Sequence, residues 1–112
     1  MRLPHADQAF IDPVKLRGYL LSSEHPVGQA KARFFKALGF HPSDWLRLRT
    51  ALERHGRFGR AREVPSSYGR KFAVEGIIEG LNGRQAAVVS VWIILPGEAV
   101  PRLVTALPGA RE

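Results

Sequence analysis

Residues 72–95 read FAVEGIIEGLNGRQAAVVSVWIIL, a stretch that predicts two antiparallel strands joined by a tight turn. The apolar side chains on one side of its first, alternating run are Phe72, Val74 and Ile78. Asn82-Gly83 is a hairpin signal because both residues tolerate a positive φ. The second run, residues 86–95, is apolar on nearly both faces and is typical of a central strand. Gly76 and Gly80 interrupt the first run, so we expect a bulge or a strong bend there.

The flanking segments extend this hairpin into a small sheet. Pro96-Gly97 turns the chain, residues 102–107 read as a returning strand, and Pro108 ends it. Residues 57–67 are polar and predict a loop or an edge strand. The second half of the chain therefore predicts an antiparallel sheet of about four strands.

The first half predicts helices. Asp12-Pro13 is typical of an N-cap followed by proline in the first turn, with a helix to about residue 21 that buries Leu16, Tyr19 and Leu20. A second helix spans about residues 27–38 and stops at Gly39, a favoured C′ residue. A third begins near Ser43 or Asp44, and its apolar stripe contains Trp45, Leu48 and Leu52.

Together these elements predict one domain over residues 1–112, with a helical part at about 12–56 and a sheet part at about 60–108. The expected fold class is α+β, with about three N-terminal helices packed on one face of a small antiparallel sheet.

The charge of the chain is its most informative bulk property. Seventeen Lys and Arg residues oppose ten Asp and Glu, which gives a net charge of +7. Such an excess favours a nucleic acid, an acidic protein or an anionic membrane as partner. A membrane is the weakest of these, because no helix joins a basic face to a large exposed apolar one.

Several kinds of site have no support in the sequence. Without cysteine there is neither a disulfide framework nor a thiolate metal site. The histidines lack metal-ligand spacing, and no glycine-rich nucleotide loop occurs. We therefore expect no metal and no other cofactor. The longest apolar run, residues 86–95, is too short to cross a bilayer, and no signal peptide is evident, so we expect a cytoplasmic protein.

Lys31 and His25 are the residues whose positions suggest chemistry. Lys31 falls within the apolar sector of the second predicted helix, so it must extend to solvent, pair with a carboxylate, or bind an anion as a phosphate ligand or general acid. His25 lies just before this helix, where an imidazole is either simply exposed or a proton carrier next to the positive end of the helix dipole.

A dense basic stretch follows. Guanidinium groups match phosphate geometry and stack on bases, although a solvated helix face explains the same pattern. The candidate nucleic-acid-binding residues are Arg47, Arg54, His55, Arg57, Arg60, Arg62, Tyr68 and Arg70.

Nearly the whole chain, from Leu3-Pro4-His5-Ala6-Asp7 onward, resembles a small bacterial domain family that occurs alone or at the C-terminus of large secreted toxins. The segments that carry the resemblance are Leu16-Arg17-Gly18-Tyr19-Leu20-Leu21, His25-Pro26-Val27-Gly28, Lys31-Ala32-Arg33-Phe34-Phe35, Leu38-Gly39-Phe40, Tyr68-Gly69, Lys71, Asn82-Gly83-Arg84, Val91-Trp92-Ile93 and Pro101-Arg102-Leu103-Val104-Thr105. The layout is similar to that of the ribonuclease superfamily that includes barnase, EndoU and the RelE toxins.

The resemblance implies a metal-independent endoribonuclease toxin that cleaves RNA by 2′-hydroxyl attack. The implied catalytic residues are His25, Lys31, Lys71, Arg102 and Thr105. Such a toxin needs an inhibitor, and a small acidic antitoxin or immunity protein matches a surface of charge +7. The alternatives are a non-catalytic module that binds nucleic acid or an acidic protein, and an interaction domain whose basic face is merely solvated.

Overall fold

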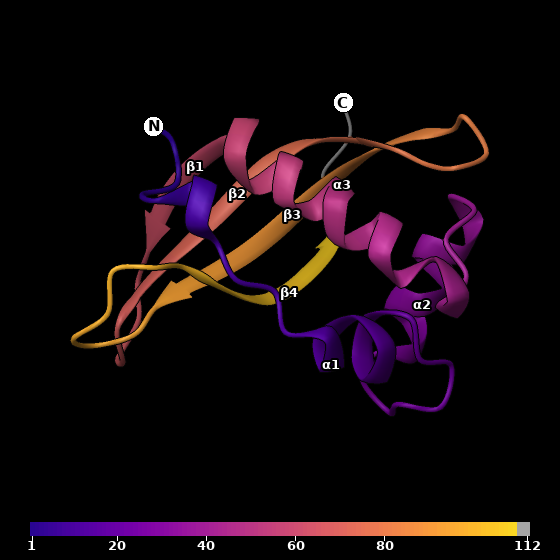
Figure 1. Ribbon diagram of the computed structural model, residues 1–112, viewed down its shortest axis with the longest axis horizontal. Coiled ribbons are helices and arrows are strands. Elements are labelled where there is room, and N and C mark those ends of the chain that lie inside the picture. Colours follow the sequence, from indigo (N-terminus) through magenta and orange to yellow (C-terminus); the bar gives the residue numbers. More distant parts are fainter. Residues whose placement is uncertain (110–112) are drawn as a thin grey trace.

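The helices precede the strands, as the computed structural model of the chain, which describes residues 1–109, shows in Figure 1. Within these residues the helical elements are η1 (Ala6–Gln8), α1 (Pro13–Lys15), η2 (Leu16–Leu20), α2 (Gln29–Ala37), η3 (Pro42–Asp44) and α3 (Trp45–Phe58). The strands are β1 (Arg60–Val64), β2 (Arg70–Glu79), β3 (Gln85–Ile94) and β4 (Arg102–Pro108). The predicted α+β fold is confirmed.

The four strands form one antiparallel sheet in the order β1-β2-β3-β4, and the helices lie over one of its faces (Figure 1). The covered face carries the core, which includes Phe72, Val88 and Trp92, together with Leu48 and Leu52 of α3. The opposite face, called the open face below, carries the alternate side chains. Its residues include Arg60 and Arg62 of β1, Lys71 and Ala73 of β2, Val91 and Ile93 of β3, and Arg102 of β4.

The predicted helix-capping residues Asp12 and Gly39 adopt the expected conformations. The side chain of Asp12 accepts a hydrogen bond from the Val14 amide at 3.0 Å, and α1 continues directly into the π-helix η2. The helix α2 ends at Ala37 with Leu38 as its C-cap, and Gly39 follows at C′ with a φ of 89°, the left-handed conformation expected there. The helix α2 begins at Gln29, two residues after the predicted start, because His25 caps the preceding turn.

Of the predicted bulge or strong bend at Gly76, the bulge is wrong. Strands β2 and β3 pair without a register shift from Arg70↔Ile94 to Glu79↔Gln85. Gly76 serves close packing instead, since a Cβ there would lie 3.3 Å from the imidazole of His55. The hairpin loop also differs in detail, because Gly83 has a positive φ and Asn82 does not.

His55 belongs to the core and not to the basic surface with which the sequence grouped it. Its side chain is 5% exposed, and Nδ1 lies 2.8 Å from the hydroxyl of Ser90. Nε2 lies 2.8 Å from the carbonyl oxygen of Val88, and the indole of Trp92 donates to the same Ser90 hydroxyl at 2.8 Å. Since a carbonyl only accepts, Nε2 carries the proton and Nδ1 accepts from Ser90. Both ring nitrogens of His55 are therefore occupied by partners within the protein.

Candidate functional site

A bulge in β4 determines where Thr105 lies. The pairing of β3 with β4 shifts register between Val91 and Trp92, so that Thr105 is opposite Val91 whereas Leu103 is opposite Trp92. Leu103 and Ala106 are both buried, and the two residues between them are only partly buried. Strict alternation would place Thr105 on the same side as Leu103. The extra residue instead turns Thr105 toward the open face at the edge of the sheet.

Tyr19 lies at the centre of a group of polar side chains at this edge. Its hydroxyl is 3.1 Å from the Thr105 hydroxyl, and its ring contacts the His25 imidazole edge to face with a centroid distance of 5.0 Å. The ammonium groups of Lys31 and Lys15 are 5.4 and 5.5 Å from the centroid of the Tyr19 ring. We call these five residues the Tyr19 cluster. Three of the predicted catalytic residues, His25, Lys31 and Thr105, therefore lie together around a tyrosine.

The electrostatic environment changes the acidity of Tyr19. Partial burial by itself raises the pKa of the phenol, but its polar contacts with Thr105 and Lys31 and the charges of Lys31 and Lys15 together lower the pKa below its ordinary value of 10.0. Among residues 1–109 the ion pairs within 4.0 Å are Arg70–Glu63 and Arg102–Glu98, so neither lysine of the cluster has a carboxylate at that distance. Within the part of the chain that the structure describes, the cluster is thus a site of positive charge without a carboxylate partner, beside a weakly acidic hydroxyl.

His25 has a structural role within the cluster. Its Nδ1 accepts hydrogen bonds from the amides of Val27 and Gly28, both at 3.0 Å, in the turn before α2. In the neutral ring the proton therefore resides on Nε2. For His25 to act as a base through Nε2, Nδ1 would have to take a proton and release both amides. This geometry favours a role for His25 in holding the turn and the Tyr19 ring.

Lys71 and Arg102 share the open face with Thr105. Both pair with Ile93, from β2 and β4 respectively, so their backbones lie roughly 10 Å apart across one intervening strand. Lys71 is partly buried, whereas Arg102 is exposed and donates to both carboxylate oxygens of Glu98 at 3.0 Å. This ion pair raises the pKa of Arg102 above its ordinary value and occupies its guanidinium.

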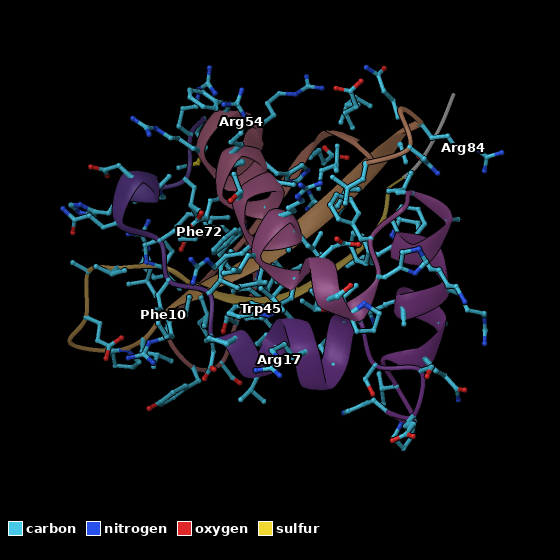
Figure 2. The ribbon with its side chains drawn as sticks, turned by 45° about the vertical axis from the view of Figure 1, so that its right-hand side comes forward. Phe10, Arg17, Trp45, Arg54, Phe72 and Arg84 are labelled. Carbon is cyan, nitrogen blue, oxygen red and sulfur yellow. The ribbon has the colours of Figure 1, made fainter. Side chains whose placement is uncertain are left out.

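The predicted nucleic-acid-binding residues do not form one surface. Arg54 and Arg57 lie over the exposed ring of Phe58 near the end of α3. Figure 2 shows Arg54 far from Trp45, at the start of this helix, and from Arg17 of η2. Arg47 is exposed on α3, and Tyr68 is exposed in the loop before β2. Arg60 and Arg62 lie on the open face. Arg70 points to the other face and is paired with Glu63 through two hydrogen bonds of 3.1 and 2.9 Å.

Two members of the cluster, Tyr19 and Lys15, were not among the predicted site residues. Tyr19 matched the apolar stripe of the first helix and was assigned to the core. The available signal was its spacing, since Lys15 precedes Tyr19 by four residues and such pairs share one face of a helix.

Residues 2–110 match the family described as a domain of unknown function, DUF6883. The chain belongs to this family. No curated protein matches the sequence. Among solved structures, one chain of a "Contact-dependent growth inhibition toxin - immunity protein complex from Klebsiella pneumoniae 342" is similar, with a TM-score of 0.67 and 14% identity over 96% of this chain and 98% of that chain. At this identity the likeness is one of fold.

Two further features concern the described part of the DUF6883 domain. No helix within residues 1–109 is long and apolar enough to span a membrane. The same residues contain no group of three or more His, Asp or Glu side chains placed to hold a metal ion.

Proposed function

We propose that this domain is a metal-independent endoribonuclease and acts as a bacterial toxin. The observation that carries the proposal is the convergence of Thr105 on the hydroxyl of Tyr19 and of Lys31 and His25 on its ring, at the edge of a sheet face that also bears Lys71 and Arg102. These groups supply what phosphodiester transfer requires: a proton acceptor, a proton donor and fixed positive charge.

The scissile phosphate binds over Val91 and Ile93 of β3, between the Tyr19 cluster and Lys71. Lys31 and Lys15 have no carboxylate partner within residues 1–109, and their positive charges attract the phosphate. The hydroxyl of Thr105 donates a hydrogen bond to a phosphate oxygen and stabilises the charge that develops there.

Tyr19 acts as the base in its phenolate form, which the neighbouring ammonium groups stabilise. It removes the proton of a ribose 2′-hydroxyl, the 2′-oxygen forms a bond to phosphorus, and the bond from phosphorus to the 5′-oxygen breaks. Lys71, two strands away on the opposite side of the phosphate, gives a proton to the leaving 5′-oxygen. The products are a 2′,3′-cyclic phosphate and a 5′-hydroxyl.

The toxin role is supported by the likeness in fold to a chain from a toxin–immunity complex. A net charge of +7 fits the member of such a pair that binds RNA, because phosphate contacts dominate that affinity. A ribonuclease acting in the cytoplasm harms the cell that makes it, so we propose an acidic immunity protein as its partner.

Cleavage of total bacterial RNA in EDTA tests the proposal. Purified wild type is compared with Lys31→Ala and with Lys36→Ala, which removes an exposed lysine from the same helix. Wild type and Lys36→Ala should yield cyclic-phosphate ends at similar rates, whereas Lys31→Ala should be slower by about 10²-fold. Intact RNA after incubation with folded wild type would overturn the enzyme and leave a basic binding module. Equal losses in both variants would instead show that only overall charge matters.

A further inference from the structure

A second feature of the open face lies next to the Tyr19 cluster, at the start of β4. The N-terminal segment runs along this end of β4 (Figure 1), where Phe10 forms a parallel bridge with Arg102. The Phe10 amide donates to the carbonyl oxygen of Pro101 at 2.8 Å, and the Leu103 amide donates to that of Phe10 at 3.0 Å. These bonds fix the backbone of Phe10, yet its side chain is 46% exposed and lies outside the core that contains Phe72 (Figure 2).

A carboxylate is held beside this ring by a tight turn. The Glu98 amide donates to the carbonyl oxygen of Leu95 at 3.0 Å, which closes a turn through Pro96 and Gly97. Gly97 has a φ of 80°, the conformation required at the third position of a type II turn, and proline suits the second. Phe10, Glu98, Ala99, Val100 and Arg102 line a shallow hollow between the turn and the N-terminal segment.

Arg102 lines this hollow with its guanidinium group. Its Cζ atom is 5.8 Å from the centroid of the Phe10 ring, and its Nε and Nη2 atoms donate in parallel to the two oxygens of Glu98, both at 3.0 Å. The guanidinium is thus a planar N–C–N group that lies against an aromatic ring and presents two adjacent donors to a carboxylate. The N1–C2–N2 edge of guanine is the same group with the same two donors.

We propose that the hollow formed by Phe10, Glu98 and Arg102 is a guanine-binding subsite, in which Arg102 occupies the position of the base in the free protein. A guanine base stacks on Phe10 and donates through N1 and N2 to Glu98. The displaced Arg102 guanidinium then turns to the neighbouring phosphate. This inference rests on the proposed function and specifies its substrate as RNA with guanosine on the 5′ side of the cleaved bond.

The chemistry of the other bases explains the selectivity. Adenine and cytosine each present one amino donor next to a ring acceptor, and uracil presents one N–H between two carbonyl oxygens. A carboxylate facing any of these meets a lone pair where it requires a donor. The position of the hollow also suits one nucleotide, because Arg102 and Thr105 are opposite Ile93 and Val91, roughly 7 Å apart along β3.

Two measurements test the subsite, of which one does not depend on cleavage. The first is calorimetric binding of 3′-GMP, 3′-AMP, 3′-CMP and 3′-UMP to the wild-type chain. The second is cleavage of four oligonucleotides that differ only in the base 5′ to one ribose. We expect 3′-GMP to bind at least 10-fold more tightly than the other nucleotides, and the guanosine substrate to have the highest kcat/KM.

Glu98→Gln should remove most of this preference, a change of about 10- to 100-fold, because the amide presents only one acceptor. Glu63→Gln is the matched control, since Glu63 forms the other two-bonded arginine pair, with Arg70 on the covered side of the sheet. Glu63→Gln should retain the preference.

The outcomes separate the subsite from the proposed activity. Selective binding of 3′-GMP without cleavage would support the subsite and overturn the ribonuclease. Cleavage with equal kcat/KM for all four bases, together with equal binding of the four nucleotides, would overturn the subsite and leave the ribonuclease intact. Loss of selectivity in both Glu98→Gln and Glu63→Gln would also overturn it.

Discussion

The Tyr19 cluster and the group formed by His55, Ser90 and Trp92 contain similar side chains but differ in burial and in hydrogen-bond partners. Each combines an imidazole, an aliphatic hydroxyl and an aromatic ring with a polar atom. In the buried group every polar atom has a partner, and His55 is 5% exposed. In the Tyr19 cluster the same kinds of group are partly exposed, and two lysines that have no carboxylate of residues 1–109 within 4.0 Å lie over the ring. Available charge and exposure to solvent, and not residue type, therefore distinguish a candidate site from a structural network.

The strongest test of this comparison is the change Tyr19→Phe. It removes the proposed base while keeping the ring, so the cleavage rate should fall by about 10³-fold. The lost hydrogen bond to Thr105 should cost only about 1 kcal/mol of unfolding free energy. Single-turnover cleavage and urea denaturation of the same sample measure both effects. A variant that retains near wild-type cleavage would exclude Tyr19 as the base.

Ser90→Ala should show the reverse pattern. It leaves the Trp92 indole N–H and the Nδ1 atom of His55 without partners in the core, at a cost of about 2–4 kcal/mol of unfolding free energy. The cleavage rate of the folded fraction should stay near that of wild type. Urea denaturation monitored by Trp fluorescence provides the measurement. A rate loss as large as that of Tyr19→Phe would mean that the two groups are coupled.

The two groups also predict different responses to pH, beginning with stability. Burial lowers the pKa of His55 below 6.5, although its bonds to the carbonyl groups of Val88 and Gly76 act in the opposite direction. The unfolded chain therefore takes up this proton first as the pH falls. The contribution of His55 to stability is complete above pH 6.5 and decreases below it, by up to about 1.4 kcal/mol per pH unit. Urea midpoints measured from pH 8 to pH 5 should decrease, and a constant midpoint would contradict the assignment.

The pH dependence of cleavage reports on Tyr19. A base must be deprotonated, so the rate should rise about 10-fold per pH unit and level off at a pH below 10, because the pKa of Tyr19 is lowered. Lys15→Gln removes one of the charges that lower this pKa and should move the plateau to higher pH. This shift is the smallest effect predicted here, since Lys15 is the weakest of the named causes. A profile that is identical in wild type and Lys15→Gln would remove Lys15 from the cluster.

Much of the fold follows from local patterns along the chain. The cap at Asp12, the glycine at position 39 and the alternating run from Phe72 act through neighbouring residues, so their effects are readable without the tertiary structure. The predicted fold class and the order of helices and strands are confirmed for this reason.

The candidate site was predicted only in part. Lys31 and Thr105 were singled out, but the phenol that joins them was assigned to the core, because an aromatic residue in an apolar stripe has the same pattern in both roles. His55 was assigned to the surface because it is flanked by arginine and glycine residues in sequence. Its burial depends on Gly76 and Ser90, which are 21 and 35 residues away.

The sequence by itself determined the helices, the strands, the excess of positive charge and the residue types available for chemistry. Only the tertiary structure decided which of these residues meet. The bulge in β4 turns Thr105 toward the open face, and the position of η2 against β4 brings Tyr19 to it, 86 residues away along the chain. Local preferences describe a residue and its neighbours, whereas a site depends on contacts between distant segments that exist only when the core has packed.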